Sequence, residues 1–457
     1  MKQNAVYLIG IGGIGMSALA RYYKHSGLFV AGYDKTKSSL TQELENEGIF
    51  IHYEDDISMI PENCKNSKNT LVIYTPAVPK EHRELNYFLA NNFNVVKRSK
   101  ILGLIANDKH TLAIAGTHGK TTTSTLLAHI LTVAADGCNA FLGGISKNYN
   151  SNLLLSSSQN LVAEADEFDR SFLQLFPNAA VITATDADHL DIYGNVDEMR
   201  KAFGEFASQI KPHGTLIIKK GIEIELPKKD IKIYTYSCNE PCDFYASDIK
   251  LCDDGCYCFD INLPNQKIRD CKLGVPGLIN VENAVAATAL TWTIGFDEQK
   301  LKNALAGFAG VKRRMDVQIN TSNLTYIDDY AHHPEELRAT ITSIKNMFEG
   351  RKITAIFQPH LYSRTRDFAD DFAKSLSLAD ELILLDIYPA RELPIDGITS
   401  KIIFDKVQCN KKTLCTKDEL MNIITENEFD VLITLGAGDI ELFVEPITKI
   451  LNEKSNV

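Results

Sequence analysis

One glycine-rich segment carries a lysine where a strand should pass into a helix. Residues 111–115 are apolar, as in a buried strand, and a helical stretch runs on to residue 132. The segment between them comprises Gly116, Thr117, His118, Gly119, Lys120, Thr121 and Thr122. Glycines let backbone N–H groups surround phosphate oxygens, so the segment predicts an ATP loop, with Lys120 on the β- and γ-phosphates and Thr121 on Mg²⁺. The segment is two residues shorter than the standard loop of this kind. The alternative to an ATP loop is a glycine turn with a lysine on the surface.

A second glycine loop lies near the N-terminus. Strand 6–9 is followed by Gly10-Ile-Gly12-Gly13-Ile14-Gly15, a helical stretch 16–25, and strand 28–33, which ends at Asp34. This order is typical of a Rossmann unit, in which a pyrophosphate lies at the helix start and the acid holds a ribose or base. A purely structural turn is the alternative. Two phosphate loops about 105 residues apart suggest one nucleotide that is consumed and another nucleotide-like group that is only held.

Two clusters of acids follow predicted strands of the middle region. The first cluster comprises Glu164, Asp166, Glu167 and Asp169, and the second comprises Asp186, Asp188, His189 and Asp191. So many carboxylates at strand ends repel one another unless a cation neutralises them. Beside a phosphate loop they favour a metal-assisted phosphoryl-transfer centre, with His189 as a ligand. A hydrated charge run and a helix-capping histidine remain the alternatives.

The last third of the chain adds basic residues at three places. Arg313 and Arg314 are either a γ-phosphate contact or a solvated linker pair. Pro334 suits the first turn of a helix, so His333 either caps that helix or contacts a ligand, and His332 and His333 cannot easily face one ligand together. A further group follows strand 353–357 and either holds a small carboxylate or is structural: His360, Arg364 and Arg366.

Alternation of strands and helices predicts an α/β protein of three domains. Residues 1–105 form an N-terminal Rossmann-like domain, and residues 313–457 form a C-terminal Rossmann-like domain. Residues 106–312 form a central P-loop ATPase-like α/β domain, in which short strands within 214–273 make a small antiparallel patch. The helix after residue 334 should face the core with Leu337, Ile341, Ile344 and Phe348.

Composition limits the partners. Lys and Arg number 48 against 59 Asp and Glu, so the net charge of −11 argues against a nucleic-acid coat and an electrostatic membrane anchor. The apolar runs are too short for a membrane span or a signal peptide, and we expect a cytoplasmic protein. Ten cysteines predict reduced thiols, and the cluster Cys238–Cys271 lacks C-x₂-C knuckles, which favours structural thiols over a metal site.

Taken together, the motifs resemble the Mur ligase family along nearly the whole chain. They fall in family order: residues 10–17, 116–122, 164–167, 329–334, 357–360 and 435–439. The resemblance implies an enzyme that uses ATP and Mg²⁺ to join L-alanine to the lactyl carboxylate of UDP-N-acetylmuramate through an acyl phosphate, in peptidoglycan precursor synthesis. It implies a monomer or weak homodimer without nucleic-acid or membrane partners. A relative that adds a murein tripeptide, a NAD-dependent oxidoreductase and a non-catalytic nucleotide-binding scaffold are the rival interpretations.

The resemblance also implies roles for single residues. For ATP these are Gly116 to Thr122, Asn280, Asn283, Arg314 and Asp329, and for Mg²⁺ they are Thr121, Glu164 and His189. For the UDP-sugar they are Gly12, Gly13, Ile14, Gly15, Asp34 and Thr75, and for L-alanine they are His333, His360 and Arg364. The residues expected to act on the reacting groups are Lys120, His189, Arg314 and His333.

Overall fold

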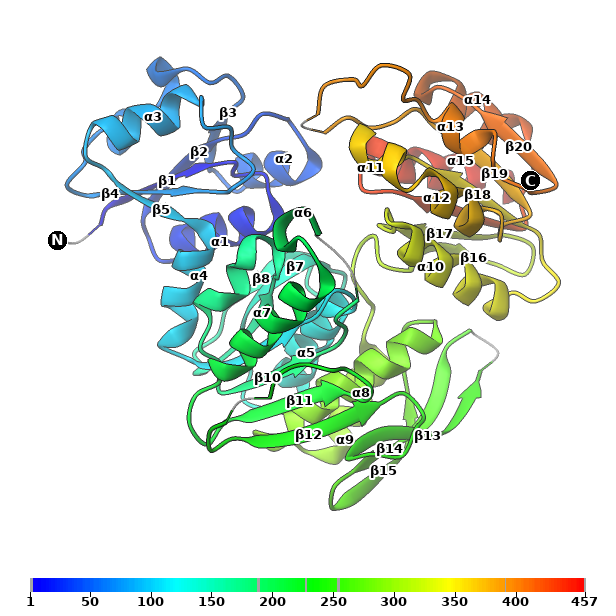
Figure 1. The fold of residues 1–457 in the computed structure, drawn as a ribbon, viewed down its shortest axis with the longest axis horizontal. Helices are drawn as coiled ribbons and strands as arrows, with labels where there is room; N and C mark the ends of the chain where they lie inside the picture. Colours follow the sequence, from blue (N-terminus) through cyan, green and yellow to red (C-terminus); the bar gives the residue numbers. More distant parts are fainter. Residues whose placement is uncertain (1–2, 187–189, 227, 253–254, 391, 456–457) are drawn as a thin grey trace. The chain divides into compact units, whose positions relative to one another are not determined.

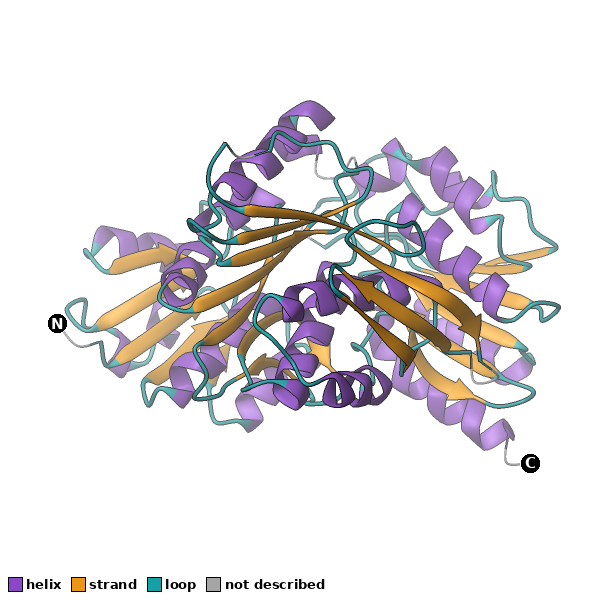
Figure 2. Cartoon of the chain, turned by 90° about the horizontal axis from the view of Figure 1, so that it is seen from below, coloured by secondary structure: helices purple, strands orange, loops and turns teal. Residues whose placement is uncertain are grey.

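The computed structural model describes residues 3–186, 190–226, 228–252, 255–390 and 392–455, and it contains three sheets (Figure 1). The chain forms two compact units, one of residues 1–275 with 279–310 and one of residues 276–278 with 311–457. In Figure 2 the strands are flanked by helices. The three sheets, each with its helices, confirm the predicted α/β class with three α/β layers.

The first sheet is parallel, with strand order β3-β2-β1-β4-β5. Its strands are β1 (Ala5–Ile9), β2 (Phe29–Tyr33), β3 (Phe50–His52), β4 (Thr70–Tyr74) and β5 (Asn94–Lys97). Its helices are α1 (Ile14–His25), α2 (Ser39–Asn46), α3 (Arg83–Ala90) and α4 (Arg98–Asn107). The central strand β1 is buried at every residue, because an apolar run between two parallel neighbours is covered on both faces.

The second sheet has ten strands in the order β15-β14-β13-β12-β11-β10-β6-β9-β7-β8. Its first five strands in chain order are β6 (His110–Ala115), β7 (Asn139–Ser146), β8 (Ser151–Leu154), β9 (Asn160–Ala165) and β10 (Ala179–Ile182). The others are β11 (Thr215–Lys219), β12 (Lys232–Ser237), β13 (Phe244–Leu251), β14 (Tyr257–Leu263) and β15 (Gln266–Lys272). The helices are α5 (Lys120–Ala134), α6 (Leu190–Tyr193), α7 (Val196–Ser208), α8 (Leu278–Trp292) and α9 (Glu298–Gly307).

The predicted small antiparallel patch is present at one edge of the second sheet. Strands β11 and β12 pair in parallel with their neighbours, and only the pairs β13–β14 and β14–β15 within 214–273 are antiparallel. A second antiparallel pair, β7–β8, lies at the opposite edge of the sheet and was not predicted. The described cysteines form no disulfides, and the described residues hold no cluster of three or more metal-ligand side chains.

The third sheet has strand order β16-β17-β21-β18-β19-β20, and only β16 is antiparallel to its neighbour. The strands are β16 (Asp316–Asn320), β17 (Thr325–Asp329), β18 (Ile353–Phe357), β19 (Glu381–Leu384), β20 (Lys411–Leu414) and β21 (Val431–Leu435). The helices are α10 (Pro334–Met347), α11 (Tyr362–Asp367), α12 (Ala369–Leu376), α13 (Lys401–Phe404), α14 (Lys417–Glu426) and α15 (Val444–Ser455). Two apolar clusters form its core, one with Leu337 and Phe372 from α10 and α12, the other with Leu420 and Ile447 from α14 and α15.

The first two sheets share one apolar core. A single cluster includes Val6 and Leu8 of β1, Leu19 of α1, Phe141 of β7 and Ala163 of β9. Helix α1 packs against both β7 and β8. The two glycine loops therefore belong to one packed unit. Within the described residues, no helix is both long enough and apolar enough to cross a bilayer.

Candidate active site

The lysine-bearing loop joins β6 to α5, as the sequence predicts. Gly116 has a backbone φ of +136° and Gly119 a φ of +81°, conformations that glycine adopts without a steric penalty. Gly119 is also the N-cap of α5 and makes no side-chain cap. The first-turn N–H groups of a fifteen-residue helix therefore follow directly on the loop, which is the arrangement that binds phosphate.

Lys120 turns back onto the loop and onto the first acid cluster. Its Nζ donates to Gly116 O at 2.6 Å and to Glu167 Oε1 at 2.8 Å. Burial opposes the charged form of Lys120, but the carboxylates of Glu167, Asp166 and Glu164 outweigh burial and raise its pKa. Burial raises the pKa of Glu167, although Lys120 acts in the opposite direction. The side chain of Lys120 is therefore a cation that lies next to the loop that the sequence predicts to bind phosphate.

The expected Mg²⁺ ligands Thr121 and Glu164 lie together. The Thr121 hydroxyl donates to Glu164 Oε1 at 3.1 Å, and the backbone N–H of Gly143 donates to Glu164 Oε2 at 3.2 Å. A hydroxyl and a carboxylate are oxygen donors of the kind that Mg²⁺ takes alongside phosphate oxygens and water. These two side chains therefore fit the ion chemically. The third expected ligand, His189, lies outside the described residues.

Asn280 and Asn283 of α8 stand beside the same loop. Asn283 Oδ1 accepts from Thr123 Oγ1 at 3.1 Å, and its Nδ2 donates to Asn280 Oδ1, also at 3.1 Å. A Cβ built on Gly119 would come within 2.9 Å of Asn283 Oδ1. Both side chains are buried. Asn283 thus braces the lysine-bearing loop, in addition to the role toward adenine that the resemblance implies.

The N-terminal glycine loop is closed by Asp34. Its carboxylate accepts from the backbone N–H of Gly12 at 2.8 Å and of Thr36 at 3.0 Å. Thr75 lies against Gly10, where a Cβ would meet its methyl group at 2.6 Å. The loop leads into α1, whose N-cap Gly13 makes no side-chain cap. Gly12, Gly13, Ile14, Gly15, Asp34 and Thr75 are thus gathered at one end of the first sheet.

In the second unit, the two neighbouring arginines have different environments. Arg313 donates to Asp328 Oδ2 and to Glu441 Oε2, both at 3.1 Å, and to the carbonyl of Gly436. Both guanidinium groups lie over the ring of Tyr330, that of Arg313 5.2 Å and that of Arg314 5.1 Å from its centroid. Both arginines are half-buried, and the ion pairs of Arg313 give it an evident structural role, whereas Arg314 is the one that the family resemblance assigns to phosphate.

Asp329 ends β17 and holds the neighbouring backbone. It accepts from the N–H of Met315 at 2.7 Å and of Ala331 at 2.9 Å. Burial raises the pKa of Asp329, while Arg314 and these N–H groups favour its ionised form. The carboxylate therefore fixes the turn that carries Arg314.

The adjacent histidines point to different surroundings. His333 is the N-cap of α10, forms a capping box with Glu336, and lies 5.0 Å from the ring of Phe368. His332 lies 5.9 Å from the ring of His360. Burial lowers the pKa of His332, and the charge of Arg364 adds to this effect. The structure thus places His332 beside His360 and within the electrostatic influence of Arg364, and it places His333 at the start of α10.

Two further residues at the site were not predicted as part of it. Glu167 is one of the four acids of the first cluster, but the sequence did not show which of the four would form an ion pair with Lys120. Arg98 lies 3.6 Å from Asp166, and a Cβ on Gly15 would meet its Nη1 at 2.7 Å. Arg98 is the first residue of α4, and no motif in the sequence around it indicated a residue of the site.

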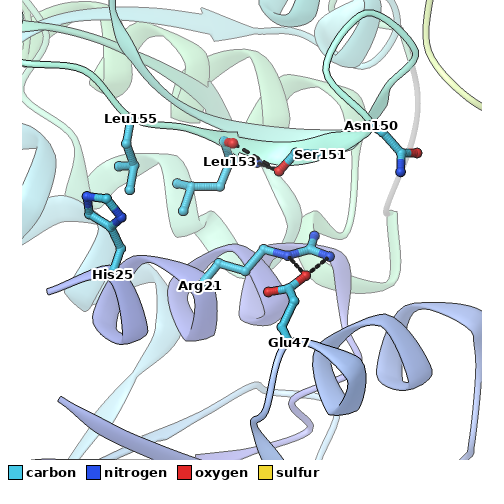
Figure 3. A pocket seen from close by; sticks show the side chains of 7 residues that line it. All are labelled: Arg21, His25, Glu47, Asn150, Ser151, Leu153 and Leu155. Atoms are coloured by element: carbon cyan, nitrogen blue, oxygen red, sulfur yellow. Dashed lines mark hydrogen bonds and ion pairs between the residues drawn. The ribbon is translucent and has the colours of Figure 1, made fainter. Parts of the chain in front are cut away.

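A polar pocket of about 330 Å³ lies elsewhere in the first unit, between α1 and the β7–β8 hairpin. Figure 3 shows Arg21, His25 and Glu47 on one side of it and Ser151, with its hairpin neighbours, on the other. None of the predicted site residues lines this pocket.

The chain folds into three α/β layers, with the lysine-bearing loop in the central one, and comparison with known families shows that it belongs to the Mur ligase family. Three family models match it in order: "Mur ligase family, catalytic domain" at residues 5–110, "Mur ligase middle domain" at 114–291, and "Mur ligase, glutamate ligase domain" at 313–438.

Individual relatives are similar along the full length. The UDP-N-acetylmuramate--L-alanine ligase of Parabacteroides distasonis is 55% identical over 452 residues, covering 98% of both chains. The enzyme of the same name from Phocaeicola vulgatus is 50% identical over 454 residues, covering 99% of both. Among solved structures, the UDP-N-acetylmuramate-alanine ligase MurC of Thermotoga maritima superposes with a TM-score of 0.81 at 29% identity, covering 99% of each chain. A murein peptide ligase from Psychrobacter arcticus, at 22% identity and a TM-score of 0.71, shows the fold alone.

Proposed function

We propose that this protein joins L-alanine to the lactyl carboxylate of UDP-N-acetylmuramate, with cleavage of ATP to ADP and phosphate. The observation that carries the proposal is the 55% identity to a ligase of that name over 98% of the chain. The phosphate loop with Lys120 agrees with the use of ATP. We place the reaction in peptidoglycan precursor synthesis, in the cytoplasm, with the enzyme as a monomer or weak homodimer.

In the proposed reaction a carboxylate oxygen of the sugar attacks the γ-phosphorus of ATP, and ADP leaves with the electrons of the broken P–O bond. The amine of L-alanine then attacks the acyl carbon, and phosphate leaves as the amide forms. Negative charge increases on the β–γ bridging oxygen in the first step. Stabilisation of this charge is assigned to Lys120, and the hydrogen bond to Glu167 and the raised pKa of Lys120 support a cation at this position; Arg314 is assigned the same task from the C-terminal domain.

Mg²⁺, held by Thr121 and Glu164 with His189, would supply further positive charge to the phosphates. Asn280 and Asn283 are assigned to the adenine side and Asp329 to the ribose. The loop from Gly12 to Gly15, with Asp34 and Thr75, is assigned to the UDP moiety. His360 and Arg364 are assigned to the carboxylate of L-alanine, together with His333.

We further propose the domain boundaries 1–105, 106–312 and 313–457 for the UDP-sugar, ATP and amino-acid parts of the reaction. Each glycine loop lies in its own α/β layer of the first unit, which supports assigning one nucleotide to each. Arg364, in the domain of the third sheet, supplies a cation for an amino-acid carboxylate, and the neighbouring histidines supply further hydrogen-bonding groups.

Phosphate release from ATP tests this proposal. The purified full chain is incubated with UDP-N-acetylmuramate and Mg²⁺, and with L-alanine, glycine, L-serine or L-Ala-γ-D-Glu-meso-diaminopimelate in separate reactions. We expect release to depend on both the UDP-sugar and an amino acid, with the highest kcat/KM for L-alanine. If phosphate release depends only on the tripeptide, the protein is a murein peptide ligase. If none of the four acceptors supports phosphate release, ligation is refuted.

A further inference from the structure

Asn152 of β8 is a buried side chain whose three hydrogen bonds all reach α1. Its Nδ2 donates to the carbonyl of Ile14 at 2.6 Å and to Ser17 Oγ at 2.9 Å. Its Oδ1 accepts from Arg21 Nη1 at 2.6 Å. Asn152 and Ser17 are both 0% exposed. A single amide thus connects the central sheet to three positions on one helix.

The three positions lie along one face of α1. Residues 14, 17 and 21 follow the i, i+3, i+7 spacing of a helix stripe, and the first of them is also the first residue of the helix. Arg21 extends the connection, because its guanidinium pairs with Glu43 at 3.0 Å and Glu47 at 2.7 Å. The side chains of Arg21 and Glu47 are visible beside the hairpin in Figure 3. The position of α1 is therefore set from its first turn to its last by contacts with its surroundings.

This connection lies between the two phosphate loops. The helix α1 begins directly after the N-terminal glycine loop. On the other side, β8 pairs with β7, β7 pairs with β9, and β9 pairs with β6, which leads into the lysine-bearing loop. Asn152 is thus connected to α1 by its side chain, and its strand is connected through the sheet to β6, which precedes the lysine-bearing loop. Asn152 itself belongs to neither glycine loop.

We infer that Asn152 is a positioning residue: its amide fixes α1 relative to the central sheet and thereby sets the distance between the bound UDP-sugar and ATP. The inference rests on the proposed assignment of the two loops to these two nucleotides. The UDP-sugar must extend from α1 to the γ-phosphate, so a small displacement of α1 moves its carboxylate away from the phosphorus. Misplacement by about 1 Å can reduce a reaction rate by about 100-fold.

The chemistry of the amide can be tested separately from its size. Asp in place of Asn152 would set a carboxylate oxygen against the Ile14 carbonyl, where the Nδ2 donor now stands at 2.6 Å. It would still accept from Arg21. Asn152→Asp therefore reverses the contact with the first turn of α1 at almost constant volume, and Asn152→Ala removes all three hydrogen bonds.

We expect both variants to slow ADP formation in a single turnover, with UDP-N-acetylmuramate, L-alanine and ATP saturating, by about tenfold or more. The dissociation constants of UDP and of ADP, measured alone by calorimetry, should stay within about twofold of wild type, because each loop remains intact. Asn139→Ala is the matched control. Asn139 is also buried in this sheet and also makes three hydrogen bonds, but to Ser156, Ser158 and Asn160 of its own domain.

The control should lose thermal stability to a similar extent and keep its single-turnover rate within about twofold of wild type. Asn152 variants with a normal rate, or with a rate that falls only as much as that of Asn139→Ala, would overturn the inference and leave the proposed function standing. So would variants whose UDP affinity is lost together with the rate, because α1 itself would then be disordered. A wild-type protein that forms no ADP with these substrates would refute the proposed function and the inference together.

Discussion

A buried acid in the first sheet gives the sharpest prediction on stability. Glu84 of α3 is 0% exposed, and its Oε2 lies 2.6 Å from the hydroxyl of Tyr7. That hydroxyl is also 2.7 Å from His52 Nε2, and His52 Nδ1 lies 2.9 Å from the carbonyl of Glu54. Burial raises the pKa of Glu84 from 4.5 to about 7 and lowers the pKa of His52.

Burial is the main cause that raises the pKa of Glu84, and the hydrogen bond that Tyr7 donates to an ionised Glu84 acts in the opposite direction. A carbonyl only accepts, so His52 donates from Nδ1 and its neutral ring accepts at Nε2. The single Tyr7 proton can satisfy His52 or Glu84, but not both. If Glu84 is protonated, it donates to Tyr7, Tyr7 donates to His52, and every contact has one donor and one acceptor. Ionisation of Glu84 breaks this chain inside the core.

The size of the effect follows from the pKa of Glu84. A change from 4.5 to about 7 corresponds to about 3 kcal/mol, at about 1.4 kcal/mol for each pKa unit. Because the folded state prefers the protonated acid, this stability is fully present below pH 4.5 and is lost as the pH rises to 7. Glu84→Gln stays neutral and should not lose it, so the variant should gain about 2.5 kcal/mol over wild type between pH 5 and pH 8, since a smaller part is already lost at pH 5.

Differential scanning fluorimetry at the two pH values measures this. We expect the difference in melting temperature, variant minus wild type, to be larger at pH 8 than at pH 5 by about 4 °C, at about 1.5 °C for each kcal/mol in a unit of this size. Glu81→Gln, at an exposed position three residues earlier, should show no such change. An equal difference at both pH values would show that Glu84 is ionised in the folded protein throughout and would refute the reasoning.

Three further predictions concern the proposed active site. Lys120→Ala should lower kcat by about 100-fold or more, because it removes the cation at the phosphate loop, while UDP-N-acetylmuramate binding by calorimetry stays within about twofold; equal loss of both would mean that the two nucleotides are wrongly separated. Gly119→Ala should raise the KM for ATP by about tenfold, since its φ is +81° and a Cβ would crowd a buried amide oxygen, and an unchanged KM would remove the loop from the ATP site. Arg313→Met should cost about 3–5 kcal/mol in thermal or urea unfolding by leaving Asp328 buried without its charged partner, whereas Arg314→Met should lower kcat and cost less stability, since Asp329 keeps the N–H groups of Met315 and Ala331; the reverse pattern would exchange the roles of the two arginines.

Much of the fold could be predicted because its signals are local. Apolar runs followed by glycine and a helical stretch marked β1, α1, β6 and α5, and the structure has each of them within a few residues. The β7–β8 hairpin was missed because its strands are short and its pairing depends on the edge of a large sheet. The small antiparallel patch was predicted correctly, but the sequence did not show which strands form it, because β11 and β12 give the same alternating pattern whether they pair in parallel or antiparallel.

The site could be predicted where a motif keeps its residues adjacent in sequence. The loop from Gly116 to Thr122 is of this kind. Pairings across the fold could not be read in the same way: Glu167 was one of four acids, and only the three-dimensional structure places it on Lys120. The choice between His332 and His333 likewise depends on how α10 begins, since the N-cap position turns one ring toward Phe368 and leaves the other beside His360.

The central claim is that the sugar carboxylate attacks the terminal phosphorus of ATP and that the amide forms by displacement of that phosphate. UDP-N-acetylmuramate labelled with ¹⁸O in both oxygens of its lactyl carboxylate tests the claim directly, with mass spectrometry of the inorganic phosphate formed in the presence of L-alanine. We predict phosphate that carries one ¹⁸O atom for each amide formed. Amide formation accompanied by unlabelled phosphate would contradict the account.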